Sequence, residues 1–298
     1  MTSSVTLHSL LGTHAGTEAL KSGRIRSPLV AFEYADVKVI NTQFKALIRE
    51  GKYDFGELAI ATYLQGYEYR KPYLMLPATI LGRNQHHTIF YNVDRGPLVP
   101  SQLSGKRVGV RAYTQTTGAW VRGVLAEDYG VDLQSVTWLT FEDPHLAEYR
   151  EPANVERAAG GKELKRMLLD GEIDAAILGD VAEQGALKHL IPDHEEEGRR
   201  WAHTHGGVPI NHIAVIHRSI VESRPDVVRE VYRMLAESRA AATLPAGLDN
   251  PMRFGVAATR ASLEQMVAYA FQQGLISRCP TADELFADAM RILGPAAE

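Results

Sequence analysis

Two breaks rich in glycine and proline divide the chain and limit the folds open to it. The first is DRGPLVP at 94–100 and the second is THGGVP at 204–209. Between them, short apolar runs alternate with segments of helical period, at 106–110, 116–129, 136–140, 162–169 and 174–179. This order of strand, helix, strand, helix, strand in about 75 residues predicts a parallel sheet with helices on its faces.

The segments outside the two breaks predict a second unit of the same class. Before the first break come the expected strands 5–11 and 29–34 and an apolar run, 74–81, that Pro77 breaks. After the second break, INHIAVIH at 210–217 looks like a returning strand, and the rest is almost all helical in pattern. We therefore expect an α/β protein of two lobes joined by two crossovers. Lobe 1 would hold 1–98 and 207–298, lobe 2 would hold 99–206, and a ligand cleft would lie between them.

Composition restricts the function classes. Hydrophobic residues make up 45% and charged residues 23% of the 298 residues, as in ordinary globular proteins. A net charge of −4 without a dense Lys/Arg run argues against a nucleic-acid partner. No apolar run approaches the ~20 residues that span a bilayer, and the start lacks the features of a signal peptide. We expect a cytoplasmic protein without membrane partners, unless a leader was removed.

The single cysteine, Cys279, excludes an intrachain disulfide and a cysteine-based zinc cluster. The oligomeric state stays open, with a homo-oligomer as one option.

A cluster of hydroxyl groups follows the first strand of the middle unit. Thr114, Thr116 and Thr117 lie where the strand gives way to a helix, and Arg111 comes just before them. Ligands of open α/β sheets bind beyond the carboxyl ends of the strands, where helix N-termini offer free N–H groups. An anion site with Arg111 gripping a carboxylate is one interpretation, and plain N-capping with a solvated arginine is the other.

Two further strand ends carry candidate residues. Glu57 lies at a strand-to-helix junction among apolar residues, where it could donate a proton, orient a histidine or cap the helix. Arg83 and the pair His86-His87 come where the chain turns between apolar runs. Alternation would send one of these histidines inward and the other outward. Adjacent histidines are more often a surface feature than a site, so this interpretation needs further support.

The segment EDPHLAEYREP offers His145 and Glu148 at i, i+3 spacing, which share a face on a helical turn. They could hold a divalent metal, act as an acid/base pair or form a solvated turn, and no third metal ligand is evident. His212 lies in the returning strand, where it either belongs to the core or faces the cleft. Tyr113 and Trp120 could stack on an aromatic ring, although Trp120 is equally suited to the core.

Several stretches resemble the 4,5-dihydroxyphthalate decarboxylase family, cytoplasmic enzymes on the type II periplasmic-binding-protein fold. The stretches are GELAIATYL at 56–64, RNQHHTIFYN at 83–92, LSGKRVGVRAYTQTTGAWVRGVLAEDYGVD at 103–132, HLAEYREPANVE at 145–156, ELKRMLLDGEIDAAILG at 163–179 and PINHIAVIH at 209–217. The first strand departs from the family pattern, because it ends in Thr13-His14 where the family usually has an Asp-Arg type pair. His14 should face the cleft, so this departure bears on the substrate.

The resemblance implies non-oxidative decarboxylation of a hydroxylated aromatic acid, such as 4,5-dihydroxyphthalate to protocatechuate, without a cofactor. Arg83 and Arg111 would hold the carboxylates, and lobe closure would strip water from the departing one. His87, which matches the family histidine, or Glu57 would protonate the ring carbon.

Two other classes share the expected fold. A substrate-binding protein of an ABC-type transporter would hold a small organic anion without chemistry. A metabolite-sensing or cofactor-precursor protein, such as those of the thiamin-pyrimidine group, would take a different ligand.

Overall fold

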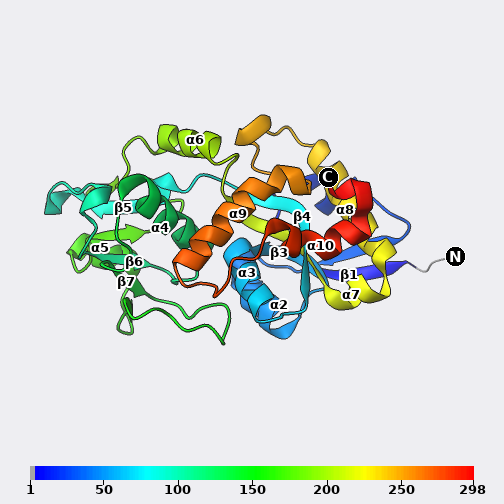
Figure 1. Cartoon of the computed structure of the whole chain (residues 1–298), viewed down its shortest axis with the longest axis horizontal. Helices are drawn as coiled ribbons and strands as arrows, with labels where there is room; N and C mark the ends of the chain where they lie inside the picture. Colours follow the sequence, from blue (N-terminus) through cyan, green and yellow to red (C-terminus); the bar gives the residue numbers. More distant parts are fainter. Residues whose placement is uncertain (1–3) are drawn as a thin grey trace.

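The computed structural model describes residues 4–298 and contains two β-sheets, each flanked by helices (Figure 1). The first sheet has the strand order β2-β1-β3-β11-β4. Its strands are β1 (Val5–Leu10), β2 (Val30–Tyr34), β3 (Phe55–Ala59), β4 (Tyr73–Gly82) and β11 (Ile210–His217). The strands β1, β2 and β3 are parallel, whereas β11 runs antiparallel to both β3 and β4. The expected α/β class is confirmed.

The second sheet has the order β10-β5-β9-β6-β7-β8. Its strands are β5 (Ile89–Asn92), β6 (Arg107–Val110), β7 (Thr137–Thr140), β8 (Val155–Arg157), β9 (Ala175–Ile177) and β10 (Leu187–His189). The parallel pairs β6–β7 and β6–β9 form the predicted βαβαβ unit. The short strand β8, which the pattern does not predict, extends it at one edge.

The chain changes sheets earlier than the glycine and proline content predicts. We expected the first crossover at 94–100, but β5 already pairs antiparallel with β9 and β10 of the second sheet. Residues 89–98 therefore lie with the second sheet, and the crossover runs through 83–88. The break at 94–100 is instead a connection within lobe 2. The return crossover leads from α6 into β11, as the second break predicts.

Pro77 does not break its strand. The apolar run 74–81 lies inside β4, an edge strand, where a missing N–H costs no ladder hydrogen bond. Register shifts between β11 and β4 accommodate the irregularity. The carbonyl of Pro77 accepts from Gly255 N at 2.8 Å, which ties the strand to the helical C-terminal region.

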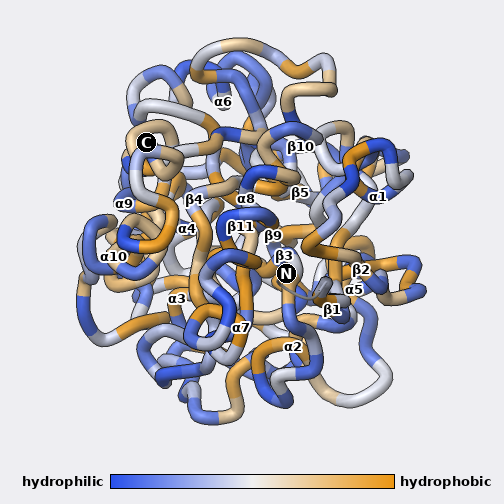
Figure 2. The backbone as a smooth tube through the Cα atoms, turned by 90° about the vertical axis from the view of Figure 1, so that its right-hand side faces the viewer, coloured by the Kyte–Doolittle hydropathy of each residue, from blue (hydrophilic) through white to orange (hydrophobic). Residues whose placement is uncertain are grey.

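Helices cover both sheets. They are α1 (Glu18–Lys21), α2 (Phe44–Glu50), α3 (Ile60–Glu68), α4 (Thr116–Tyr129), α5 (Leu164–Asp170), α6 (His194–Thr204), α7 (Arg218–Ser223), α8 (Pro225–Ala240), α9 (Val256–Gln272) and α10 (Ala282–Leu293). The hydropathy of α10 alternates along the tube (Figure 2), in keeping with its one buried face. Among residues 4–298, no helix is both long enough and apolar enough to cross a membrane.

The two lobes are joined along one side by helices α4 and α9, which we call the seam. Figure 1 shows α9 running beside α4, between the lobes. Trp120 on α4 is fully buried, and its Nε1 donates to the carbonyl of Ile210 on β11 at 2.8 Å. The buried Arg122 donates to Gln273 Oε1 at 2.7 Å, just beyond α9. The seam therefore gives the lobes a shared interface of buried side chains.

Candidate functional site

A pocket of about 220 Å³ lies between the lobes, beside the first turn of α4. An apolar cavity of roughly 150 Å³ holds one benzene ring, so the pocket has the scale of a single substituted ring. Its walls come from β3, β4, β11, the start of α4 and the ends of β6 and β9. The lining residues are Asn41, Phe44, Ala59, Leu81, Arg83, Arg111, Gln115, Thr116, Thr117, His145, Asp180, Asn211 and His212.

The start of α4 faces this pocket. The N-cap is Gln115, and its side chain makes no capping hydrogen bond. Thr116 and Thr117 are the first helical residues and line the pocket, so the threonines are not N-caps. The first N–H groups of a helix have no partner within it and carry partial positive charge. This wall of the pocket therefore suits an anion.

Two other predicted site residues of this segment, Thr114 and Tyr113, do not line the pocket. Thr114 is buried and does not line the pocket. Tyr113 is also buried, and its hydroxyl donates to the carbonyl of Gln273 at 3.2 Å, so its ring belongs to the seam. Stacking of Tyr113 or the buried Trp120 on a ligand ring is therefore not supported by the geometry.

Two arginines lie in the pocket wall, and each contacts a carboxylate of lobe 2. Arg83 pairs with Asp180, and Arg111 Nη1 lies 3.4 Å from Glu142 Oε2. The side chain of Asp180 is 61% exposed and that of Glu142 47%. Exposed ion pairs contribute little to stability, so an incoming carboxylate can replace either partner at small cost.

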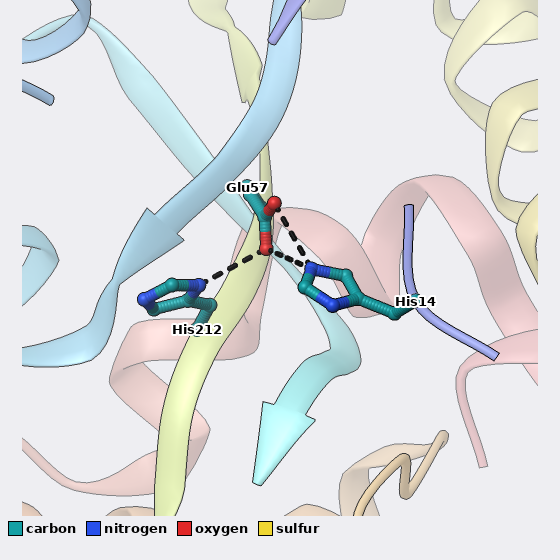
Figure 3. Close-up of side chains that lie close together, drawn as sticks. All are labelled: His14, Glu57 and His212. Atoms are coloured by element: carbon teal, nitrogen blue, oxygen red, sulfur yellow. Dashed lines mark hydrogen bonds and ion pairs between the residues drawn. The ribbon is translucent and has the colours of Figure 1, made fainter. Parts of the chain in front are cut away.

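Glu57, His14 and His212 form a cluster at one side of the pocket, in which Glu57 is buried and the two histidines are partly buried (Figure 3). Glu57 lies on β3, and His212 lies on the neighbouring strand β11, paired with Ala59. The Oε2 atom of Glu57 lies 3.0 Å from His14 Nε2 and 3.0 Å from His212 Nδ1. In Figure 3 the other ring nitrogen of His212 points away from Glu57.

The carboxyl of Glu57 is fully buried but charged. Burial alone would raise its pKa, but hydrogen bonds from His14 and His212, together with the charge of these rings, hold the pKa below its usual range. An ionised carboxylate only accepts hydrogen bonds, so the facing ring nitrogens donate. Glu57 is therefore suited to orient a histidine and unsuited to donate a proton.

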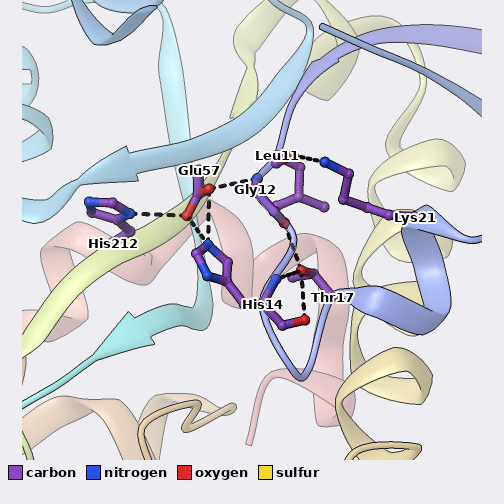
Figure 4. A network of polar contacts seen from close by, with 7 residues as sticks. All are labelled: Leu11, Gly12, His14, Thr17, Lys21, Glu57 and His212. Atoms are coloured by element: carbon purple, nitrogen blue, oxygen red, sulfur yellow. Dashed lines mark hydrogen bonds and ion pairs between the residues drawn. The ribbon is translucent and has the colours of Figure 1, made fainter. Parts of the chain in front are cut away.

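The loop after β1 fixes this cluster from the other side (Figure 4). The N–H of Gly12 donates to Glu57 Oε1 at 2.7 Å. Thr17 Oγ1 donates to the carbonyl of Gly12 at 2.7 Å and accepts from the N–H of His14 at 2.8 Å. Neither His14 nor Glu57, both predicted to be site residues, is among the pocket-lining residues, and His14 is linked to the pocket through the carboxylate that it shares with His212.

The adjacent histidines at the crossover differ in burial as expected, but they lie in a 3-10 turn, His86–Thr88, so strand alternation is not the cause. His86 is buried, and no hydrogen-bond partner is found for either ring nitrogen among residues 4–298. His87 Nε2 lies 2.7 Å from Asp180 Oδ1, and His87 is not among the pocket-lining residues. Burial and nearby positive charge, with Arg83 first, lower the pKa of His87 to about 4, although the Asp180 carboxylate acts in the opposite sense.

The pair His145 and Glu148 is split. Residues 141–150 are not helical, so the i, i+3 spacing does not bring the two side chains to one face. His145 lines the pocket with Nδ1 2.7 Å from Thr62 Oγ1, and burial lowers its pKa to about 4. Glu148 lies 2.6 Å from Lys71 Nζ and does not line the pocket. This pair cannot form the metal site that the spacing left open.

Sequence reasoning missed Asp180, Asn211, Asn41 and Phe44 in the pocket wall. Asp180 follows β9, so the strand-end rule that singled out Arg111 applies to it equally. Asn211 precedes His212 on β11 and accepts from Gln85 Nε2. The ring of Phe44 meets that of His212 edge-on, with centroids 5.1 Å apart. No local pattern distinguishes Phe44 from a core residue.

Comparison with known proteins supports a relationship to decarboxylases. The chain is 28% identical over 213 residues to 4,5-dihydroxyphthalate decarboxylase of Comamonas testosteroni, across 67% of this chain and 64% of that protein. It is 34% identical over 142 residues to the enzyme of the same name from Pseudomonas putida, across 45% of this chain and 55% of that protein. The chain thus matches less than two thirds of either relative's length. No family model matches.

Solved structures support the fold. The alkanesulfonate-binding protein SsuA from Xanthomonas axonopodis pv. citri, bound to MOPS, superposes with a TM-score of 0.59 at 14% identity. The superposition covers 96% of this chain and 97% of that one. The resemblance seen in the sequence is confirmed: the chain is similar in sequence to two 4,5-dihydroxyphthalate decarboxylases and has the type II periplasmic-binding-protein fold.

Proposed function

We propose that the protein decarboxylates a hydroxylated aromatic acid of the phthalate type, such as 4,5-dihydroxyphthalate, without oxidation. One observation carries the proposal. Two guanidinium groups, the start of a helix and a carboxylate-held imidazole all face one pocket of single-ring size. The two decarboxylases to which the chain is related add support to the reaction class.

Binding would use the positive side of the pocket. Arg83 and Arg111 would exchange Asp180 and Glu142 for the carboxylates of the substrate, each with the two-point grip of a planar guanidinium. The N–H groups and hydroxyls of Thr116 and Thr117 would donate hydrogen bonds to whichever substrate carboxylate lies against the start of α4. Closure of the lobes about the seam would then exclude water from the departing group.

The chemical step exchanges carbon dioxide for a proton at one ring carbon. The bond between the carboxylate carbon and the ring breaks, and its electron pair stays on the ring carbon, assisted by a ring hydroxyl. That carbon takes a proton from His212 Nε2, and solvent restores the proton to His212. Glu57 would hold His212 through Nδ1 and stabilise the charged imidazole before transfer.

We assign the proton donor to His212 because it lines the pocket and its partner is a fully buried carboxylate. His87 remains the candidate that the family resemblance suggests, and it could reach the pocket only after leaving Asp180. The proposed chemical step uses no organic cofactor. A cytoplasmic location remains a prediction from the sequence.

The second candidate is reversible binding of a small organic anion, as in a transporter's binding protein. It is favoured by the similarity of the fold to an alkanesulfonate-binding protein. The test is to incubate the protein with hydroxylated benzene mono- and dicarboxylates while following carbon dioxide release and, separately, heat of binding. Turnover of a hydroxylated phthalate supports the decarboxylase. Tight binding across the panel without any carbon dioxide release contradicts it and favours a binding protein.

A further inference from the structure

We propose that His14, Glu57 and His212 bind one divalent transition-metal ion, of which zinc is the best example. The inference goes beyond the proposed function and does not rest on it, because it stands on the geometry of the cluster alone. One ligand atom from each of the three residues lies within 4.8 Å of the others. These residues come from the β1 loop, β3 and β11, so the fold brings together distant parts of the chain.

The spacing between the Glu57 carboxylate and each histidine nitrogen suits a shared small ion. His14 Nε2 lies 3.1 Å from Glu57 Oε1 and 3.0 Å from Oε2, and His212 Nδ1 lies 3.0 Å from Oε2. Ligands at zinc bond lengths of about 2.1 Å lie roughly 3.0–3.5 Å apart for angles between square and tetrahedral. The ion would replace the two N–H protons that now point at the carboxylate.

Gly12 leaves space beside these atoms. A Cβ at this position would lie 2.5 Å from Glu57 Oε1 and 2.8 Å from His14 Nε2. Any larger residue would therefore crowd the two ligand atoms. The same glycine supplies the N–H that holds Glu57 Oε1, which is the kind of outer contact that orients a ligating carboxylate.

The donor set selects the class of ion. Two imidazoles and a carboxylate are ligands of zinc and of other first-row transition ions, whereas magnesium and calcium prefer oxygen alone. Three protein ligands leave one or more positions open, as in catalytic rather than structural zinc sites. The ammonium of Lys21 donates to the carbonyl of Leu11 at 2.5 Å, so its nitrogen is bonded outside the cluster.

An ion could enter and contact the pocket without unfolding the protein. The side chain of His14 is 25% exposed and that of His212 16%, while Glu57 is fully buried. His212 also lines the pocket, so the ion would lie next to the ligand space. Coordination through Nδ1 would replace the proton that the charged imidazole of the proposed proton transfer carries there, so the metal-bound and proton-donating forms of His212 are alternatives.

The test is zinc binding by the full chain, with any purification tag removed and the metal stripped by a chelator. After dialysis against zinc, gel filtration and mass spectrometry should find one zinc per chain. Cobalt should give the visible absorption of a low-coordinate His/carboxylate site. By titration calorimetry, His14→Ala and His212→Ala should bind zinc more than about 100-fold more weakly, whereas His145→Ala, in the same pocket, should bind like the wild type.

Gly12→Ala guards against variants that fail to fold, because it keeps all three donors and fills the space beside them. Its circular dichroism should match the wild type while its zinc binding falls. Wild-type protein that retains no zinc, or His14→Ala that retains as much as the wild type, overturns the proposal. Neither outcome bears on carbon dioxide release from a hydroxylated phthalate, so the two proposals fail separately.

Discussion

The seam and the pocket both connect the lobes, but they do so with opposite kinds of contact. At the seam the guanidinium of Arg122 is fully buried, donates to Gln273 and to the carbonyl of Tyr113, and lies 3.9 Å from the Tyr113 ring centroid. At the pocket, Arg83 meets the largely exposed Asp180. An arginine side chain is thus a fixed part of the core at the seam, whereas at the pocket an arginine has a partner that a ligand can replace.

This difference separates stability from function. Buried polar groups are costly to unpair, so the seam should resist separation throughout a catalytic cycle. Exposed ion pairs are worth little, so the pocket side can open and accept a ligand. Substitutions at the seam should lower the free energy of unfolding, and substitutions in the pocket should change kcat or KM at nearly constant stability.

The largest effect is expected from His212→Asn. Loss of a positioned general acid typically costs about 10²–10⁴-fold in rate, so kcat for a hydroxylated phthalate should fall by that order. Carbon dioxide release is the measurement, and the exposed His203→Asn on α6 is the control. His87→Asn should lower kcat less than His212→Asn. A larger loss of kcat in His87→Asn than in His212→Asn would assign the proton donor to His87, as the family resemblance suggests.

Arg122→Met should reduce the free energy of unfolding by about 2–4 kcal/mol, because it leaves Gln273 and the Tyr113 carbonyl without their buried donor. Urea unfolding measures the change, and Arg166→Met on the exposed face of α5 is the matched control. The kcat of the folded variant should stay near the wild type. A stable Arg122→Met protein with impaired turnover would contradict the division between seam and pocket.

The acid side of the stability curve should report buried histidines. Burial lowers the pKa of His86 to about 4 from its ordinary value near 6.5, so the unfolded chain takes up a proton first. The folded state should therefore lose stability as the pH falls from about 6.5 to about 4. His86→Leu should flatten this part of the curve in urea unfolding at several pH values, with His203→Leu as the control. An unchanged slope would show that His86 does not drive the loss.

Much of this architecture could be predicted from the sequence, because it depends on local patterns. The helix at 116–129 and the strands of the middle unit follow from periodicity, and Arg111 and Thr116 follow from the strand-end rule. Periodicity does not indicate which strands pair, so the pairing of 89–92 with strands of the second sheet could not be predicted from the sequence.

The site was harder to predict because its contacts are long-range. Glu57 lies 43 residues from His14 and 155 from His212, and the pairing of β3 with β1 and with β11 brings them together. The same limit explains why Tyr113 and Thr114 were wrongly expected in the pocket. No local pattern indicates that the turn after β6 directs their side chains into the core. A spacing rule also paired His145 with Glu148, which fails where the backbone is not helical.

Arg111→Lys tests whether the guanidinium of Arg111 in the pocket wall binds a substrate carboxylate. Lysine keeps the charge but loses the planar fork, so KM should rise about 10-fold with a smaller change in kcat. Steady-state kinetics on a hydroxylated phthalate is the measurement. Arg107→Lys, at the start of the strand that Arg111 follows and paired with Glu156 outside the pocket, is the control. Equal effects at both positions would remove Arg111 from the binding role.

The smallest effect is expected from Asp180→Asn. Without its carboxylate the residue no longer competes for Arg83, so KM should fall roughly 2- to 5-fold, in line with the small worth of an exposed ion pair. Asp174→Asn at the other end of β9 is the control. A rise in KM would mean that Asp180 helps to hold the ligand instead of occupying its place.

The position of β11 between β3 and β4 also has a consequence for biosynthesis. During translation β3, β4 and the whole of the second sheet leave the ribosome before β11 does. A nascent chain that ends before residue 210 has a gap in its first sheet and lacks the imidazole that completes the pocket. The pocket is therefore complete only after most of the chain has been synthesised, and a product that ends before residue 210 should lack the proposed ligand site.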